Sequence, residues 1–211
     1  MNSLPVLPMM PSPQVVFPYQ VTALHVSDPR MMALLAEVSA TTKRFGVWNL
    51  HQSPGEGRLL GTMVTIEKEI SLSGGHSFVV VRGEQRLEID GWLASDDYPR
   101  ARVQLLPTRD CVVDSRVLDA AENALRAVRN LEIEMDLAPH ATGIGALDSD
   151  PGVRTWQICA MTSASSAEQL FLLGLSQPDE RMREVAEWCC DRYGELQRAL
   201  VDQGDLLPPA N

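Results

Sequence analysis

The amino-acid sequence predicts an α+β fold in which a curled, mostly antiparallel β-sheet precedes a set of helices. Two observations carry this prediction. Up to about residue 113, short apolar runs alternate with clusters of Gly, Pro and Ser, as strands and turns do. Beyond that point, apolar residues recur at steps of three and four, which is the period of a helix. We therefore divide the chain into a β-rich part, 1–113, and a helical part, 114–211.

Length and composition fit a folded domain of ordinary size. The chain has 211 residues, of which 45% are hydrophobic and 22% charged, so it can build a substantial core. No apolar run approaches the roughly 20 residues of a membrane helix. The N-terminus lacks the basic residues of a secretory signal. We expect a cytoplasmic protein that does not bind membranes.

The β-rich part contains about six strands. It opens with L-P-V-L-P, where Pro5 and Pro8 remove backbone donors, so we expect this segment at a sheet edge. After this extended segment, the six strands are expected over residues 21–26, 45–50, 59–72, 78–82, 86–89 and 100–106. Such runs, joined by short turns, favour antiparallel pairing.

The stretch H-V-S-D-P-R-M-M-A-L-L, residues 25–35, gathers the residue types of a reactive centre. The stretch is better explained as the start of a helix. Asp28 is a preferred N-cap, and Pro29 suits the first helical position, where its missing N–H costs nothing. We therefore predict a helix over 28–40, inserted in the sheet. Its apolar face is expected to be formed by Met31, Leu34, Leu35 and Val38.

Four helices are predicted in the second part. Two are expected over 115–135 and 153–162. The third begins near a capping box, in which a serine at 165 or 166 precedes Glu168 or Gln169 by three residues. The fourth begins at S-Q-P-D, 176–179, with Pro178 in its first turn.

The sequence contains no motif for catalysis or nucleotide binding. G-x-x-x-x-G-K-[ST], G-x-G-x-x-G, G-x-S-x-G and H-E-x-x-H are all absent. Histidines and cysteines are scattered without the spacing of metal ligands, at His25, His51, His76 and His140 and at Cys111, Cys159, Cys189 and Cys190. We therefore expect that the protein is not an enzyme and that it binds no cofactor and no metal. We also expect its thiols to be buried and reduced. The net charge of −10 opposes binding to nucleic acid.

An ordered series of motifs resembles the N-terminal, substrate-binding domain of Lon proteases. The series contains L-P-V-L-P, V-V-F-P (15–18), L-H-V-S-D-P-R-M (24–31), F-G-V (45–47), L-G-T-M-V-T-I (60–66) and V-R-G-E-Q-R-L-E-I (81–89). Segments at 156–162, 165–173 and 178–185 resemble its helical subdomain. Ser27 and Met31 stand where the family has Phe and Tyr, which concerns packing and specificity more than fold. The resemblance spans about residues 4–203.

This resemblance implies a twisted, partly closed PUA-like pseudobarrel followed by a C-terminal helical bundle. It also implies a stand-alone, non-catalytic recognition module without ATPase and peptidase domains. The expected partners are unfolded or tagged polypeptides, or a separate protease for which the chain is an adaptor or regulator. A PUA-like binder of small molecules or RNA is the alternative. No oligomeric state is indicated.

Five apolar residues are our candidates for contact with a bound peptide: Met9, Met10, Phe17, Met31 and Met32. Methionine is flexible and polarizable, so it adapts to different partners. The other interpretation is that each of them is an ordinary core residue.

Overall fold

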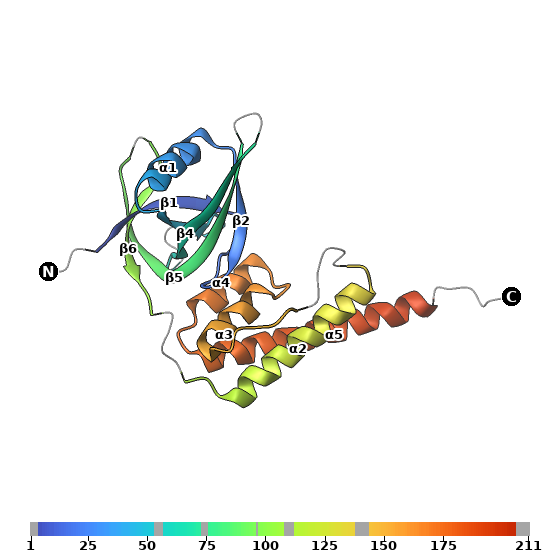
Figure 1. Ribbon diagram of the computed structural model, residues 1–211. Helices are drawn as coiled ribbons and strands as arrows, with labels where there is room; N and C mark the ends of the chain where they lie inside the picture. Colours follow the sequence, from blue (N-terminus) through green and yellow to red (C-terminus); the bar gives the residue numbers. More distant parts are fainter. Residues whose placement is uncertain are drawn as a thin grey trace. The chain divides into compact units, whose positions relative to one another are not determined.

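The computed structural model describes residues 4–52, 57–72, 76–95, 97–107, 112–137 and 144–205. The chain divides into two compact units (Figure 1). The first comprises Met1–Asp110 with Ser165–Gly174, and the second comprises Cys111–Ala164 with Leu175–Asn211. The division expected from the sequence, 1–113 and 114–211, assigns Ser165–Gly174 to the helical part. In the structure this segment packs within the unit that contains the sheet.

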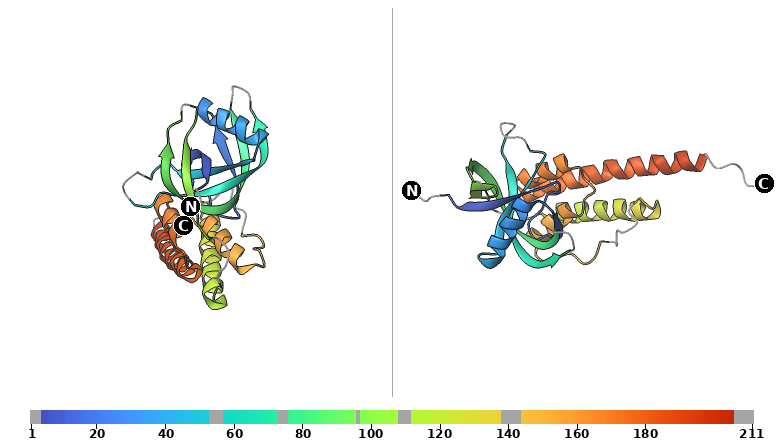
Figure 2. Two further views of the ribbon diagram at one scale, coloured as in Figure 1. Left: turned by 90° about the vertical axis from the view of Figure 1, so that its left-hand side faces the viewer. Right: turned by 90° about the horizontal axis from the view of Figure 1, so that it is seen from above.

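Six strands form one curled sheet in the first unit, seen from a second side in Figure 2. Their order is β2 (Val21–Val26), β5 (Ser77–Leu93), β4 (Leu60–Ser71), β3 (Arg44–Asn49), β1 (Val6–Ser12) and β6 (Arg100–Leu105). β6 returns to pair with β5, which closes the ring. Only the β1–β3 pair is parallel among the pairs of this sheet. The predicted α+β fold with a partly closed, mostly antiparallel sheet is confirmed.

β5 is the strand that makes closure possible. The sequence predicted two strands here, 78–82 and 86–89, but the structure has one long strand that pairs with β2, β4 and β6. At Gly83 the chain segment before β2 crosses close by. A Cβ there would lie 2.0 Å from the carbonyl oxygen of Phe17, so only glycine lets β5 continue past this point.

The expectation that the opening segment lies at a sheet edge is wrong, because β1 lies between β3 and β6. β1 changes partner along its length. Pro8 is the last of its residues that pairs with β6, and pairing with β3 begins at Met9. The missing N–H of Pro8 therefore falls where one ladder ends and the next begins, and Met9 donates to the carbonyl oxygen of Pro99.

The helix α1 (Pro29–Ala40) begins as predicted. The Asp28 carboxylate accepts the N–H of Arg30 at 2.7 Å, and Pro29 lies in the first turn. All four residues of the predicted apolar face, Met31, Leu34, Leu35 and Val38, are buried. They pack with β-strand residues in one hydrophobic core cluster of this unit.

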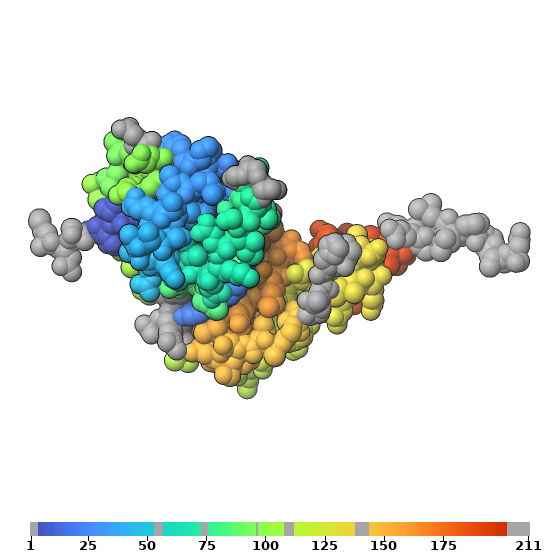
Figure 3. All heavy atoms as spheres, turned by 45° about the horizontal axis from the view of Figure 1, so that its top comes forward, coloured from blue at the N-terminus to red at the C-terminus, as the bar shows by residue number. Residues whose placement is uncertain are grey.

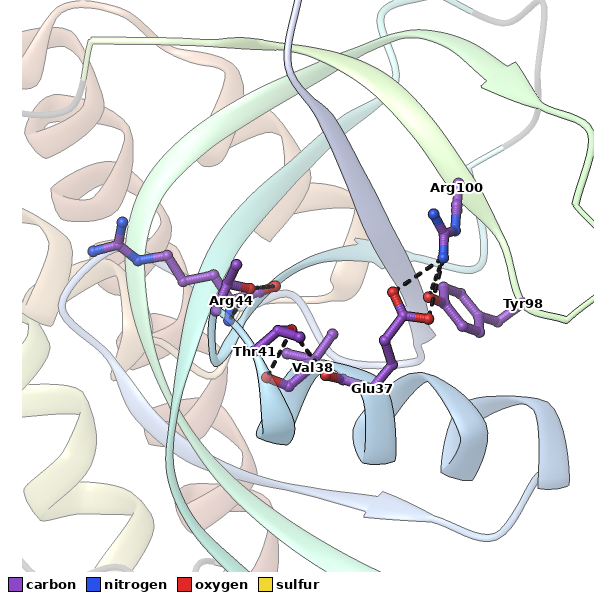
Figure 4. A network of polar contacts seen from close by, with 7 residues as sticks. Glu37, Val38, Thr41, Arg44, Tyr98 and Arg100 are labelled. Carbon is purple, nitrogen blue, oxygen red and sulfur yellow. Dashed lines mark hydrogen bonds and ion pairs between the residues drawn. The ribbon is translucent and has the colours of Figure 1, made fainter.

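Polar contacts at the surface fix the other side of α1 (Figure 4). The Arg100 guanidinium on β6 donates to the Glu37 carboxylate of α1 at 3.1 Å, and it also donates to the Tyr98 hydroxyl. The Thr41 hydroxyl donates to the carbonyl oxygen of Glu37, where the helix ends. These contacts hold α1 against the strand that closes the sheet.

A buried arginine joins the helix α4 (Ser166–Gly174) to the sheet. Arg86 of β5 is 3% exposed. Its Nη1 donates to the carbonyl oxygen of Leu173 at 2.9 Å, and its Nη2 donates to that of Pro107 at 2.6 Å. One side chain therefore binds the middle of β5 to the last turn of α4 and to the chain that leaves β6.

The predicted capping box at the start of α4 is confirmed. The N–H of Ser165 donates to the Glu168 carboxylate at 2.7 Å, and the N–H of Glu168 donates to the Ser165 hydroxyl at 3.4 Å. The cap fixes where α4 starts, and Arg86 fixes where it ends.

The second unit is built from α2 (Ser115–Glu134), α3 (Pro151–Ala160) and α5 (Pro178–Asp205), close to the predicted bounds. Its centre holds another buried arginine, Arg181, which lies 3.4 Å from the ring centroid of Trp156 and donates to the carbonyl oxygen of Leu175. Among the described helices, none is long and apolar enough to cross a membrane.

Two of the cysteines in this unit are buried, as expected. Burial raises the pKa of the Cys159 thiol to about 12 and that of the Cys189 thiol to about 11. Cys190 differs from the expectation, because it is exposed. Cys111 lies outside the described residues.

We expect Arg86→Met to lower the free energy of unfolding by about 3 kcal/mol, because two carbonyl oxygens lose their donor. Urea unfolding followed by circular dichroism measures this. Arg82→Met is the matched control, since Arg82 lies on the same strand but forms an exposed pair with Glu67. That variant should cost less than about 1 kcal/mol. Equal stability of the two variants would contradict the anchoring role of Arg86.

We also expect Cys190 to be alkylated by iodoacetamide well before Cys159 and Cys189 in the native protein. The thiolate is the reactive form, and burial disfavours it in the two buried residues. Tandem mass spectrometry of the digested protein separates the adjacent Cys189 and Cys190. Equal labelling of all three before unfolding would show that the helical core is open.

Candidate functional site

The five candidates from the sequence lie in or against the cores of the first unit. Met9, Met10, Phe17 and Met31 are buried, with exposed fractions of 0%, 3%, 1% and 7%. Met32 is half-buried and packs against the core below α1. A peptide could reach the four buried side chains only if the core opened. Their placement agrees with the other interpretation, that of core residues, so they do not form a surface that a peptide can contact.

An apolar surface lies on the outer face of β2, β5 and β4. We call it the outer patch, and we define it by Val21, Ala23, His25, Ile70, Leu72, His76, Phe78 and Val80. Side chains alternate between the two faces of a strand. The intervening residues Leu24, Val26, Val79 and Val81 therefore point into the core, where they are buried.

Strand register brings the central residues of the outer patch together. Phe78 lies opposite His25 on one side and opposite Ile70 on the other. The rings of His25 and Phe78 have centroids 5.2 Å apart, and those of His25 and His76 are stacked at 5.3 Å. The result is a row of side chains across three neighbouring strands.

Large apolar side chains in the outer patch are unusually open to solvent. Val21 is 47% exposed, Ile70 40%, Leu72 42% and Phe78 38%. Single exposed apolar residues are ordinary, but several on one face are typical of an interaction surface. β4 and β5, teal to green in Figure 3, form part of the solvent-facing surface of this unit.

Charges around the outer patch are few. Lys68 lies on the same face, opposite Val80. The Arg82 guanidinium contacts the Glu67 carboxylate at 2.6 Å, so these two charges largely compensate each other. Among the residues that the structure describes, no three His, Cys, Asp or Glu side chains gather as metal ligands do. The outer patch therefore offers aromatic and aliphatic contact for a binding partner.

Sequence reasoning missed the outer patch although it found the strands. His25 could face either side of its strand, and the run F-V-V-V at 78–81 is apolar on both faces. A continuous apolar run is typical of a strand buried on both sides. Only the three-dimensional arrangement shows that, in the described part of the chain, one face of β5 is open to solvent at Phe78. His51 lies in the turn after β3, and His140 is outside the described residues.

A protein-family model and several known proteins match most of this chain. A model of the ATP-dependent protease La (LON) substrate-binding domain matches residues 5–191. The Lon protease of Roseiflexus castenholzii is 29% identical over 189 residues, which cover 85% of this chain and 23% of that protein. Lon protease 2 of Herpetosiphon aurantiacus is 33% identical over 192 residues, 87% of this chain and 23% of that protein. The chain thus spans about a quarter of these relatives.

Solved structures share the fold. The Lon N-terminal domain protein from Xanthomonas campestris has a TM-score of 0.64 at 20% identity, covering 88% of this chain and 99% of that chain. The N-terminal domain of the Mycobacterium avium complex Lon protease has a TM-score of 0.64 at 16% identity, covering 89% and 99%. Because the family match extends over most of its residues, this chain belongs to the family of Lon protease substrate-binding domains.

Proposed function

We propose that this chain is a non-catalytic recognition module that binds unfolded or tagged polypeptides at the outer patch. Membership of the substrate-binding family supports a role in substrate recognition. The observation that carries the proposal is the row of His25, Phe78 and Ile70, exposed on three adjacent strands. Unfolded polypeptides expose the apolar side chains that such a surface would cover.

The same proposal includes an adaptor role. As an adaptor, the chain would hold a polypeptide in the cytoplasm and present it to a separate protease. The Lon proteases that it resembles support this link to proteolysis.

The size of the outer patch suits weak and reversible binding. Covering about 300 Å² of apolar surface on each partner, about 600 Å² in total, contributes about 15 kcal/mol at ~25 cal/mol per Å². Much of that is offset by the freedom lost on association. We therefore expect dissociation constants on the order of 10 µM. A bound polypeptide, which we call a client, can be passed on to a protease when it is held this weakly.

Phe78→Ser tests the proposal, because Phe78 lies at the centre of the row. We expect it to weaken binding to a reduced and alkylated, permanently unfolded protein by about tenfold. Fluorescence anisotropy of the labelled unfolded protein measures the affinity. Leu50→Ser is the matched control, since Leu50 is 45% exposed in the first unit but lies in the turn after β3, outside the outer patch. It should leave affinity unchanged.

Two results would contradict the proposal. One is equal affinity of the two variants and the wild type. The other is no binding by the wild type at tens of micromolar. Retention of structured RNA at low salt would favour the alternative, a PUA-like nucleic-acid binder, against the net charge of −10.

A further inference from the structure

β2 has a strand neighbour on one side. It pairs with β5, and no other described strand pairs with it. Figure 1 draws it at the border of the sheet. Its residues Val21, Ala23 and His25 are exposed. β2 therefore borders the outer patch and supplies three of its side chains.

A hydrogen bond at the start of β2 shows which of its backbone groups face outward. The N–H of Gly83 donates to the carbonyl oxygen of Gln20 at 2.8 Å, so Gln20 turns its carbonyl toward β5. Alternate residues of an antiparallel strand face alternate neighbours. Thr22, Leu24 and Val26 thus bond to β5, and the residues between them turn their N–H and C=O groups to the open side.

A hydrogen bond at the N-terminal end of β5 supports this assignment independently. The N–H of Leu72 donates to the carbonyl oxygen of His76 at 2.8 Å, so His76 faces β4. By the same alternation Phe78 and Val80 also face β4, and Val79 and Val81 face β2. Val79 lies opposite Leu24, so Leu24 faces β5. Its neighbour Ala23 therefore faces the open side, which is the same result that the Gly83–Gln20 hydrogen bond gives.

β2 lacks the devices that protect exposed strand edges. Edge strands are usually interrupted by charged residues, prolines or bulges, which prevent pairing with another chain. The sequence V-T-A-L-H-V contains no Lys, Arg, Asp, Glu or Pro, and its register with β5 is continuous. An edge left in this state is suited to accept another strand.

We propose that an extended, apolar segment of another polypeptide adds to the sheet beside β2, with its backbone bonded to Val21, Ala23 and His25. This inference rests on the proposed function and gives its binding mode. Alternate side chains of the added strand would lie beside the outer patch, and the others would lie beside Leu24 and Val26. Backbone hydrogen bonds are the same for every sequence, which explains how one surface accepts many clients.

Charge favours a separate client over a second copy of this chain. Each copy carries −10, so two copies repel each other when they approach edge to edge. No carboxylate lies on β2 itself. A client segment that is neutral or basic meets no such opposition. The proposed occupant is therefore an apolar segment without acidic residues.

Backbone methylation of a peptide provides the test. The probe is a fluorescein-labelled peptide of about eight residues, the length of a typical strand, in which Val alternates with Thr and a Lys precedes the strand. Two derivatives carry N-methyl groups on one or the other alternate set of residues. We expect one derivative to bind at least about tenfold more weakly and the other to bind within about twofold of the parent, because only one set donates to β2.

Protein variants provide the reciprocal test. Ala23→Pro removes an N–H that faces the open side and leaves the bonds to β5 in place, as prolines at sheet edges do. We expect it to weaken binding of the parent peptide about fivefold or more. Ala23→Val keeps the N–H, so it should bind at least about fivefold more tightly than Ala23→Pro. Leu50→Ser, outside the outer patch, is the control that should bind like the wild type. The methylated peptides need no change in the protein, so they remain decisive if Ala23→Pro folds poorly.

The outcomes separate this inference from the proposed function. If both methylated peptides bind like the parent while Phe78→Ser weakens binding, strand addition is overturned and the proposed function stands. If neither the peptide nor the unfolded protein binds, both fall. A concentration-dependent dimer that Ala23→Pro abolishes, with no effect of the peptide, would show that β2 pairs with a second copy and would overturn the client as occupant.

Discussion

The buried guanidinium of Arg86 is the interaction on which the first unit depends. Two of its hydrogen bonds reach the last turn of α4 and the chain that leaves β6, segments far apart in the sequence. Burying a cation is costly unless its donors are satisfied. The geometry of all three segments is therefore coupled. Arg86 also stands where the motif V-R-G-E-Q-R-L-E-I resembles the family, so this anchor belongs to the part of the sequence that marks the fold.

Arg86 holds β5 in place. β5 contributes side chains both to the hydrophobic core and to the outer patch. Leu87 packs in one core cluster, and one face of the first half of the strand supplies Val79 and Val81 to another. Its other face carries Phe78 at the centre of the outer patch. Gly83 lets the strand pass the Phe17 backbone and Arg86 bonds it to α4, so the strand that carries Phe78 is held by contacts away from the outer patch. A binding surface of this kind needs no opening of the core, which agrees with the burial of Met9 and Met31.

Sequence patterns located the elements because they depend on local chemistry. The Asp28 cap, the Ser165 capping box and the apolar face of α1 depend on residues within a few positions of each other, and all were predicted. What the sequence did not indicate depends on distant contacts. Pairing of β1 between two strands and the continuity of β5 come from sheet closure. The same holds for the outer patch, since nothing local distinguishes an apolar strand face that is covered from one that is open.

Amide hydrogen exchange along β2 tests the central claim most directly, that this strand has a free edge which a client completes. In the free protein, the amides of Val21, Ala23 and His25 should exchange quickly and those of Thr22, Leu24 and Val26 slowly, since only the second set bonds to β5. Adding the alternating Val/Thr peptide should slow the first set and leave the second unchanged. Slow exchange of all six amides in the free protein, or no change with a saturating peptide, would contradict the account.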